Sequence, residues 1–109
     1  HILFNLISNA VDAIQKDGKI KIDYGVKNEM FYINVEDNGK GIDDNNLENI
    51  FNPFFFFFSP GEGTGLGLYI VNTEVEKMNG EINVKSEKDR GTTFEITLKV
   101  EVRREENGI

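Results

Sequence analysis

The sequence KIKIDYGVKNEMFYINVED, residues 19–37, has the clearest alternating pattern in the chain. Apolar side chains alternate with other residues in both of its halves, at Ile20, Ile22, Tyr24, Val26, Phe31, Ile33 and Val35. A period of two is typical of a strand with one apolar face, and residues 27–29 between the halves suit a turn. The stretch therefore predicts two paired strands.

Two further segments, one on each side of this hairpin, have the spacing of amphipathic helices. Residues 2–14 carry apolar side chains at intervals of three and four, at Leu3, Leu6, Ile7, Ala10 and Ile14. Residues 64–78 follow the same rule, at Leu68, Val71, Val75 and Met78. Such spacing gathers the apolar residues on one face of a helix. We therefore expect two helices, the second ended by a left-handed stop at Asn79 and Gly80.

The remaining segments complete a two-layer arrangement. Residues 43–51 can hold a short helix capped by Asp or Asn, which Pro53 would end. Residues 81–86 and 92–102 alternate like strands and are joined by the charged turn 87–91. Helices on one face of a sheet give an α+β two-layer sandwich. We assign one domain to residues 1–102 and expect residues 103–109 to form a frayed tail.

Composition excludes several classes of function. The chain has 109 residues and a formal charge of −7, without the clustered cations of a nucleic-acid surface. It has no cysteine and one histidine, which excludes disulfides and makes a zinc enzyme improbable. No segment has the ~20 apolar residues of a bilayer span. We expect a cytoplasmic domain without direct membrane contact, whether or not the full-length protein is membrane-anchored.

The first predicted helix has a second, polar face. His1, Asn5, Asn9 and Asp12 stand four, four and three residues apart, which aligns them along one side of the helix. A solvated surface explains this alignment, although asparagine is a mediocre helix former. The alternative is a ligand-binding face, because an amide oxygen is a hard neutral ligand suited to Mg²⁺.

Asp37 ends the first hairpin with the same parity as Val35. A continuing strand would point its carboxylate toward the apolar side, which costs several kcal/mol unless the charge is paired. Residues 36–41 could be a simple turn. The functional alternative is that Asp37 accepts a hydrogen bond from a ligand, which Gly39 and Gly41 let the backbone approach.

Residues 61–68, GEGTGLGL, lead into the second predicted helix. Free N–H groups and the helix dipole in such a segment can cradle a phosphate. The segment is neither a P-loop nor a G-x-G-x-x-G motif, and a flexible connection explains it equally well when it is taken alone. With so acidic a chain, a polyanion would need backbone donors or a metal ion rather than a lysine cluster.

Four stretches taken together resemble the sequence boxes of a known family. HILFNLISNAVDAI (1–14), EDNGKGI (36–42), IFNPFF (50–55) and GEGTGLGLYIV (61–71) are similar, in this order, to the four boxes of the catalytic ATP-binding domain of two-component sensor histidine kinases. GTTFEITL (91–98) also resembles the closing strand of that domain. The resemblance implies an α/β sandwich with a mixed, mostly antiparallel sheet covered on one face by helices.

The resemblance also implies roles for individual residues. Asn9 would bind the Mg²⁺ that bridges the ATP phosphates, with Asn5 assisting there as the second residue of the catalytic pair. Asp37 would accept the adenine amino hydrogen, and Thr92 or Thr93 would reach the adenine through water. The complete implied set for ATP or ADP is Asn5, Asn9, Asp12, Asp37, Gly39, Gly41, Ile42, Gly63, Thr64, Gly65, Leu66, Gly67, Leu68, Thr92 and Thr93.

By the same resemblance the domain would donate the γ-phosphoryl group of Mg-ATP to a histidine on a separate dimerisation domain, upstream of a response regulator. The acceptor histidine is missing from this chain, because His1 belongs to the first box by its spacing to Asn5. Two rival functions stay open. One is a gyrase-class ATP hydrolase, which would be expected to carry a glutamate at position 1. The other is a non-catalytic nucleotide-binding or interaction module.

Phe56, Phe57 and Phe58 depart from the family pattern, which often has Thr-Thr-Lys after Pro-Phe-Phe. The departure removes two hydroxyls and a lysine that could reach a phosphate. Three explanations are open: burial in the core of this domain, docking on a partner domain, and an engineered or misassigned sequence.

Overall fold

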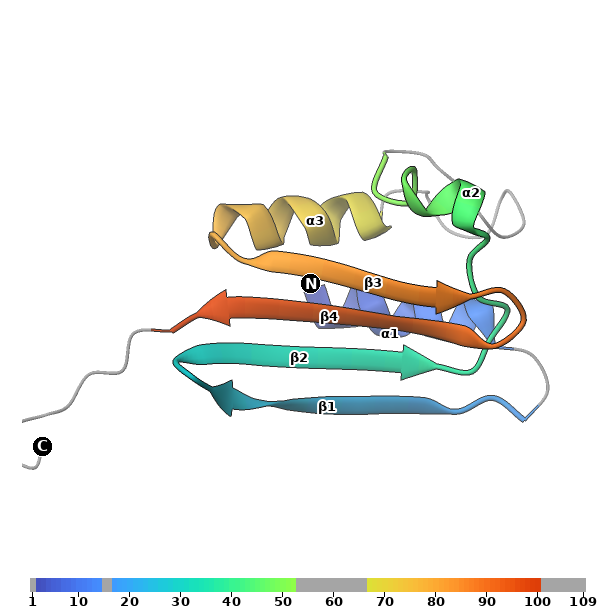
Figure 1. Ribbon diagram of the computed structural model, residues 1–109, viewed down its shortest axis with the longest axis horizontal. Coiled ribbons are helices and arrows are strands. Elements are labelled where there is room, and N and C mark those ends of the chain that lie inside the picture. The colour runs from blue at the N-terminus through green and yellow to red at the C-terminus, as the bar shows by residue number, and fades with distance from the viewer. Residues whose placement is uncertain (1, 15–16, 53–66, 101–109) are drawn as a thin grey trace, which may run out of the picture.

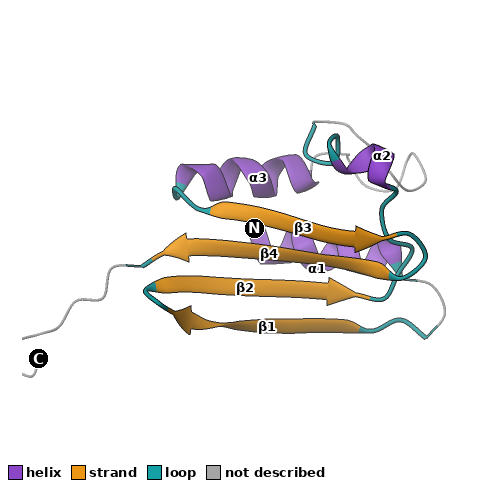
Figure 2. Cartoon of the chain, viewed as in Figure 1, coloured by secondary structure: helices purple, strands orange, loops and turns teal. Residues whose placement is uncertain are grey.

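A computed structural model describes residues 2–14, 17–52 and 67–100 of the chain. Its elements are α1 (Ile2–Ala13), β1 (Ile20–Lys27), β2 (Met30–Asp37), α2 (Asp44–Leu47), α3 (Gly67–Lys77), β3 (Glu81–Glu87) and β4 (Gly91–Lys99) (Figure 1). Figure 2 shows the same chain coloured by type of secondary structure. Both predicted hairpins and all three predicted helices are present. The predicted extensions into residues 64–66 and 101–102, the proposed tail at 103–109 and the phenylalanine run lie outside the described residues.

The four strands form one antiparallel sheet in the order β1-β2-β4-β3. β2 pairs with β1 on one side and with β4 on the other, so Asp37 stands between Ile20 and Thr92. The resemblance implied a mixed sheet, but every pairing among the described strands is antiparallel. The reason is that each hairpin turns its chain back on itself, and the hairpins then join through β2 and β4 running in opposite directions.

The helices cover one face of this sheet and enclose the core. Figure 1 shows α1 running behind the strands and α3 lying along the β3 side. The buried apolar cluster joins both layers and consists of Leu6, Ala10, Val35, Ile42, Ile50, Leu68, Val71, Val75, Phe94 and Ile96. The predicted two-layer α+β sandwich is therefore confirmed.

The β1 edge is the most exposed part of the helix-facing side of the sheet among the described strands. Ile22, Tyr24 and Val26 point to the helix side but are 42%, 69% and 61% exposed. On α1, Leu3 is 39% exposed, whereas Leu6, Ala10 and Ala13 are buried. The cause is the position of α1, which packs its buried stripe against the middle of the sheet, so that no described element covers the outer part of β1. Alternation predicted the strand correctly, and the exposure of its apolar side is a finding of the structure.

The end of α3 has the geometry of a left-handed stop, as the sequence predicts. Asn79 has a φ of 56°. The Gly80 N–H donates to the Val75 carbonyl at 2.9 Å, and the Asn79 N–H donates to the Glu76 carbonyl at 3.0 Å. These two bonds form a Schellman motif, which satisfies carbonyls that the helix itself leaves without donors. The motif ends α3 and lets the chain turn into β3, which begins at Glu81.

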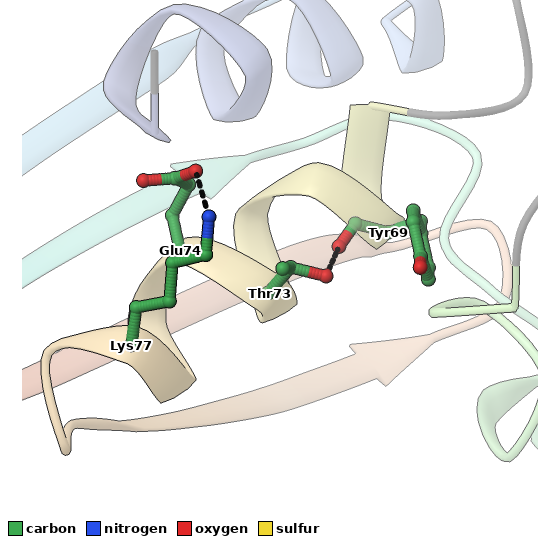
Figure 3. A network of polar contacts seen from close by, with 4 residues as sticks. All are labelled: Tyr69, Thr73, Glu74 and Lys77. Atoms are coloured by element: carbon green, nitrogen blue, oxygen red, sulfur yellow. Dashed lines mark hydrogen bonds and ion pairs between the residues drawn. The ribbon is translucent and has the colours of Figure 1, made fainter.

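Two local polar contacts lie on the outward side of α3 (Figure 3). The Thr73 hydroxyl donates to the Tyr69 carbonyl at 2.9 Å, and Lys77 Nζ lies 3.6 Å from Glu74 Oε1. Ion pairs as exposed as this one contribute little to stability. The helix is held instead by its buried face. None of the helices in the described ranges has the length and apolar content needed to cross a bilayer.

We predict that Gly80→Ala lowers the free energy of unfolding by about 1–3 kcal/mol. A methyl group at position 80 would collide with the Leu98 side chain and lie 2.7 Å from the Thr97 carbonyl oxygen. Gly67→Ala is the matched control, because the nearest described atom to its methyl group would be Asn5 Oδ1 at 3.4 Å. Urea denaturation compares the two variants. If Gly80→Ala were as stable as the parent, β4 could not pack against the end of α3 as described.

Candidate functional site

Asp37 lies at the carboxyl end of β2, on the side of the sheet that faces the helices. Its exposed fraction is 5%, as its parity with Val35 predicts. The Gly39 N–H donates to Oδ1 at 2.8 Å, and the Thr92 backbone N–H also hydrogen-bonds to the carboxylate. Burial raises the pKa of Asp37 above its ordinary value of 3.8, aided by the charge of Glu36 and opposed by the two backbone N–H groups. Asp37 is thus a buried acceptor with capacity left for a donor from a ligand.

The loop that follows Asp37 is fixed from two sides. The Lys40 N–H donates to the Ala13 carbonyl at 3.0 Å, at the end of α1. From the β3–β4 turn, the Asp89 N–H donates to the Lys40 carbonyl at 2.6 Å. Figure 1 shows this loop passing beside that turn on its way to α2. The loop is therefore held between the helix layer and the second hairpin.

Gly39 and Gly41 are required for this close contact. A side chain on Gly39 would collide with the Ala13 carbonyl group. Gly41 has a φ of 70°, and a side chain there would run into the Glu87 carbonyl. Both glycines therefore let backbone pack on backbone within the chain itself. Their packing positions the loop, in addition to any room that they leave for a ligand.

A hydroxyl network on β3 and β4 adds a residue that the sequence analysis missed. Ser86 Oγ accepts the Ile42 N–H at 2.7 Å, donates to the Gly91 carbonyl at 3.0 Å and lies 2.7 Å from Thr92 Oγ1. The signal was present in the strand pattern, since Ser86 continues the inward positions of Ile82 and Val84. A serine at an apolar-side position is a buried polar group that needs partners.

These groups border a groove of about 380 Å³ at one end of the sheet. The ends of β2 and β3 and the start of β4 line it. Both sides of the sheet contribute to its walls: Asp37, Ser86 and Thr92 from the helix-facing side, and Glu36, Lys85 and Thr93 from the other. Thr92 is 4% exposed and pairs with Asp37 on the helix-facing side. Thr93 is half-buried on the opposite side of the sheet, where it pairs with Glu36 and Lys85. Both predicted threonines line the groove, but only Thr92 shares the helix-facing side with Asp37.

The polar face of α1 lies along the α3 side of the helix layer. Asn5 and Asn9 are half-buried and Asp12 is exposed. Asn5 borders the first described turn of α3, where Gly67 leaves room for its amide oxygen. Half-burial departs from a fully solvated helix face. The helix therefore presents two half-buried amide groups, and that of Asn5 lies next to the start of α3.

The remaining predicted residues fall into two groups. Ile42 and Leu68 belong to the buried core cluster, at 2% and 6% exposure, so their side chains serve packing. His1, Gly63, Thr64, Gly65 and Leu66 lie outside the described residues. Over residues 2–14, 17–52 and 67–100, no three His, Cys, Asp or Glu side chains are grouped as metal ligands would be.

Comparison with known proteins identifies the family. Residues 1–102 match the family described as histidine kinase-, DNA gyrase B-, and HSP90-like ATPases. The sensor histidine kinase ZraS of Escherichia coli K12 is 39% identical over 105 residues, which cover 96% of this chain and 22% of that protein. The autoinducer 2 sensor kinase/phosphatase LuxQ of Vibrio vulnificus is 41% identical over 110 residues, covering 92% of this chain and 13% of LuxQ. The chain thus spans less than a quarter of these relatives.

Solved structures agree with this result. The catalytic domain of histidine kinase ThkA in a nucleotide-free form has a TM-score of 0.77 and 32% identity, over 90% of this chain and 63% of that one. Full-length ShkA in complex with AMPPNP has a TM-score of 0.78 and 27% identity, over 90% of this chain and 20% of that one. The chain therefore belongs to the family of histidine kinase-, DNA gyrase B- and HSP90-like ATPases, and its relatives within that family are sensor histidine kinases.

Proposed function

We propose that the chain is the ATP-binding catalytic domain of a two-component sensor histidine kinase. It binds Mg-ATP and donates the γ-phosphoryl group to a histidine on a separate dimerisation domain, which leaves ADP. The observation that carries this proposal is the buried Asp37 carboxylate at the groove, held by two backbone N–H groups. Its support from outside the structure is the identity with sensor kinases such as ZraS.

Asp37 recognises the adenine base in this proposal. A buried carboxylate is a strong acceptor, and the adenine amino group is a donor that could satisfy it. The Gly39 and Thr92 N–H groups orient the carboxylate before any ligand arrives. Thr92 lies beside it on the same face and supplies a hydroxyl to the same end of the groove.

The phosphates would lie toward the start of α3, near Asn5 and Asn9. Amide oxygens fit Mg²⁺, which prefers hard oxygen ligands, and Asn9 is the residue that would hold it. Bound Mg²⁺ would offset phosphate charge, which a chain of formal charge −7 does not offset by its overall balance. Asn5, at the border of α3, would orient the phosphates beside the start of the helix. Positioning of the γ-phosphoryl group relative to the acceptor would then provide much of the catalysis.

The partners follow from the reaction. A histidine-bearing dimerisation domain of the same kinase would receive the phosphoryl group, and a response regulator would take it onward. The domain would act in the cytoplasm and occupy residues 1–102. DNA gyrase B-like ATPases belong to the same family, but the relatives compared here are named as sensor kinases.

We predict that the isolated chain binds Mg-ATP but takes up no stable phosphoryl label from γ-labelled ATP, because the acceptor histidine lies on another domain. Incubation with labelled ATP and gel analysis measures this. Addition of the dimerisation domain of the same kinase should produce label on that domain alone. Label that persists on the isolated chain would contradict an acceptor located elsewhere.

We predict that Asn9→Ala and Asp37→Ala weaken nucleotide binding in different ways. Asp37→Ala removes an ionised acceptor, so affinity should fall about 10- to 150-fold with or without Mg²⁺. Asn9→Ala should weaken binding only when Mg²⁺ is present. Calorimetric titration with ATP in magnesium and in EDTA separates the two effects. Parent-like affinity for Mg-ATP in both variants would refute this placement of the site.

The buried carboxylate also predicts a pH dependence of stability in the nucleotide-free chain. The folded pKa of Asp37 lies above 3.8, so the folded state favours the protonated form more than the unfolded chain does. The contribution of Asp37 to the free energy of unfolding should therefore fall as pH rises from 3.8 through the folded pKa. Asp37→Asn does not titrate at this position and serves as the reference. The parent's free energy of unfolding minus that of Asp37→Asn, from urea denaturation at several pH values, should decrease with rising pH. An increase of this difference with rising pH would contradict the prediction, because it would mean that folding favours the ionised form of Asp37.

A further inference from the structure

The Ser86 hydroxyl has three hydrogen-bond partners. Its hydroxyl oxygen lies 2.7 Å from the Ile42 backbone nitrogen, 3.0 Å from the Gly91 carbonyl oxygen and 2.7 Å from Thr92 Oγ1. One proton and two lone pairs are all that a hydroxyl possesses. The three contacts therefore use the full capacity of Ser86.

The direction of each hydrogen bond follows from these chemical types. The Ile42 N–H can only donate, and the Gly91 carbonyl can only accept. The single proton of Ser86 is thus committed to Gly91, and the remaining lone pair of Ser86 must accept from Thr92. The Thr92 hydroxyl consequently turns its proton toward Ser86 and presents only lone pairs in its other directions.

Thr92 is also the neighbour of Asp37. The two residues pair across β2 and β4, both are about 5% exposed or less, and the Thr92 backbone N–H bonds to the Asp37 carboxylate. With its proton held by Ser86, the Thr92 hydroxyl adds an acceptor to the end of the groove where Asp37 is already an acceptor. A ligand group that meets both the Asp37 carboxylate and the Thr92 hydroxyl must therefore bring donors.

We propose that Ser86 is a positioning residue for base specificity, which holds the Thr92 hydroxyl as an acceptor beside Asp37. This inference rests on the proposed function, in which Asp37 recognises adenine. The exocyclic amino group of adenine carries two N–H donors and satisfies an acceptor-only pair directly or through a bound water. A purine without that amino group leaves buried acceptors unpaired, which is a strong basis for discrimination.

Ser86 also has a structural role that the test must separate from positioning. Its acceptance of the Ile42 N–H joins the loop after β2 to β3, so its loss should also lower stability. A fall in melting temperature alone would not support positioning. The ratio of affinities for two bases is the informative quantity, because general loosening of the domain weakens both ligands together.

The experiment compares calorimetric dissociation constants of Mg-ATP and of the magnesium complex of purine riboside 5′-triphosphate, which lacks the amino group. The parent should prefer ATP. Ser86→Ala frees the Thr92 proton to turn toward the groove, so the preference should fall by about 2- to 10-fold. Ser86→Thr retains a hydroxyl and should retain the preference.

Two further variants keep the result interpretable. Val84→Ala removes apolar volume from the inward side of the same strand, two residues away, and should lower the melting temperature without changing the preference. Thr92→Val removes the acceptor itself, so combining it with Ser86→Ala should give no further loss of preference. The absence of a further loss in the double variant tests whether Ser86 acts through the Thr92 hydroxyl, even if Ser86→Ala is poorly stable.

The outcomes distinguish the two proposals. A parent that binds both triphosphates equally would overturn the role of Asp37 in adenine recognition, and this inference with it. A parent that prefers ATP, with the full preference retained in Ser86→Ala, would overturn the role of Ser86 alone. Additive losses in Ser86→Ala and Thr92→Val would also overturn it, because the two hydroxyls would then act separately.

Discussion

Burial of one carboxylate, that of Asp37, is the constraint on which the rest of the site depends. A buried charge requires hydrogen-bond donors, and here both donors are backbone N–H groups, from Gly39 and Thr92. The first requires the chain to turn sharply after β2. The second requires β4 to lie next to β2 in the register that brings Thr92 opposite Asp37. The hydrogen bonding of the Asp37 carboxylate thus depends on the turn after β2 and on the pairing of β2 with β4.

The second hairpin, β3–β4, holds the loop that follows Asp37 from the other side. Its turn contacts the loop through the Lys40 carbonyl, and Ser86 holds the Ile42 N–H. Gly41, with its positive φ, allows the two backbones to meet. Loop, turn and sheet end therefore form one packed unit, and the groove they border is shaped before a ligand binds. Such preorganisation lowers the cost of ordering on binding.

Much of this could be predicted from periodicity. The period of two in residues 19–37 predicts both strands, and its continuation predicts the burial of Asp37. The helix stop at Asn79 was likewise readable, because few residues tolerate a positive φ. These features are local, so the sequence near each position determines them.

What was missed depends on contacts between distant segments. The exposure of β1 could not be predicted, because alternation indicates which side a residue faces but not whether another layer covers it. Parity with Phe94 indicates that Thr92 rather than Thr93 faces the helices, but only the register of β4 against β2 places Thr92 opposite Asp37. The strand pattern indicates an inward position for Ser86, but its partner Ile42 is 44 residues away and is brought to it only by the fold.

The central claim is that a nucleotide base binds on the Asp37 side of the sheet end. Thr92 and Thr93 are adjacent in sequence but lie on opposite faces, so their methyl groups report directly on this claim. Intermolecular nuclear Overhauser contacts between adenine ring protons of bound Mg-ADP and assigned threonine methyl groups measure it. The account predicts contacts to Thr92 and none to Thr93. Contacts to Thr93 without Thr92, or saturable binding with contacts to neither, would contradict it.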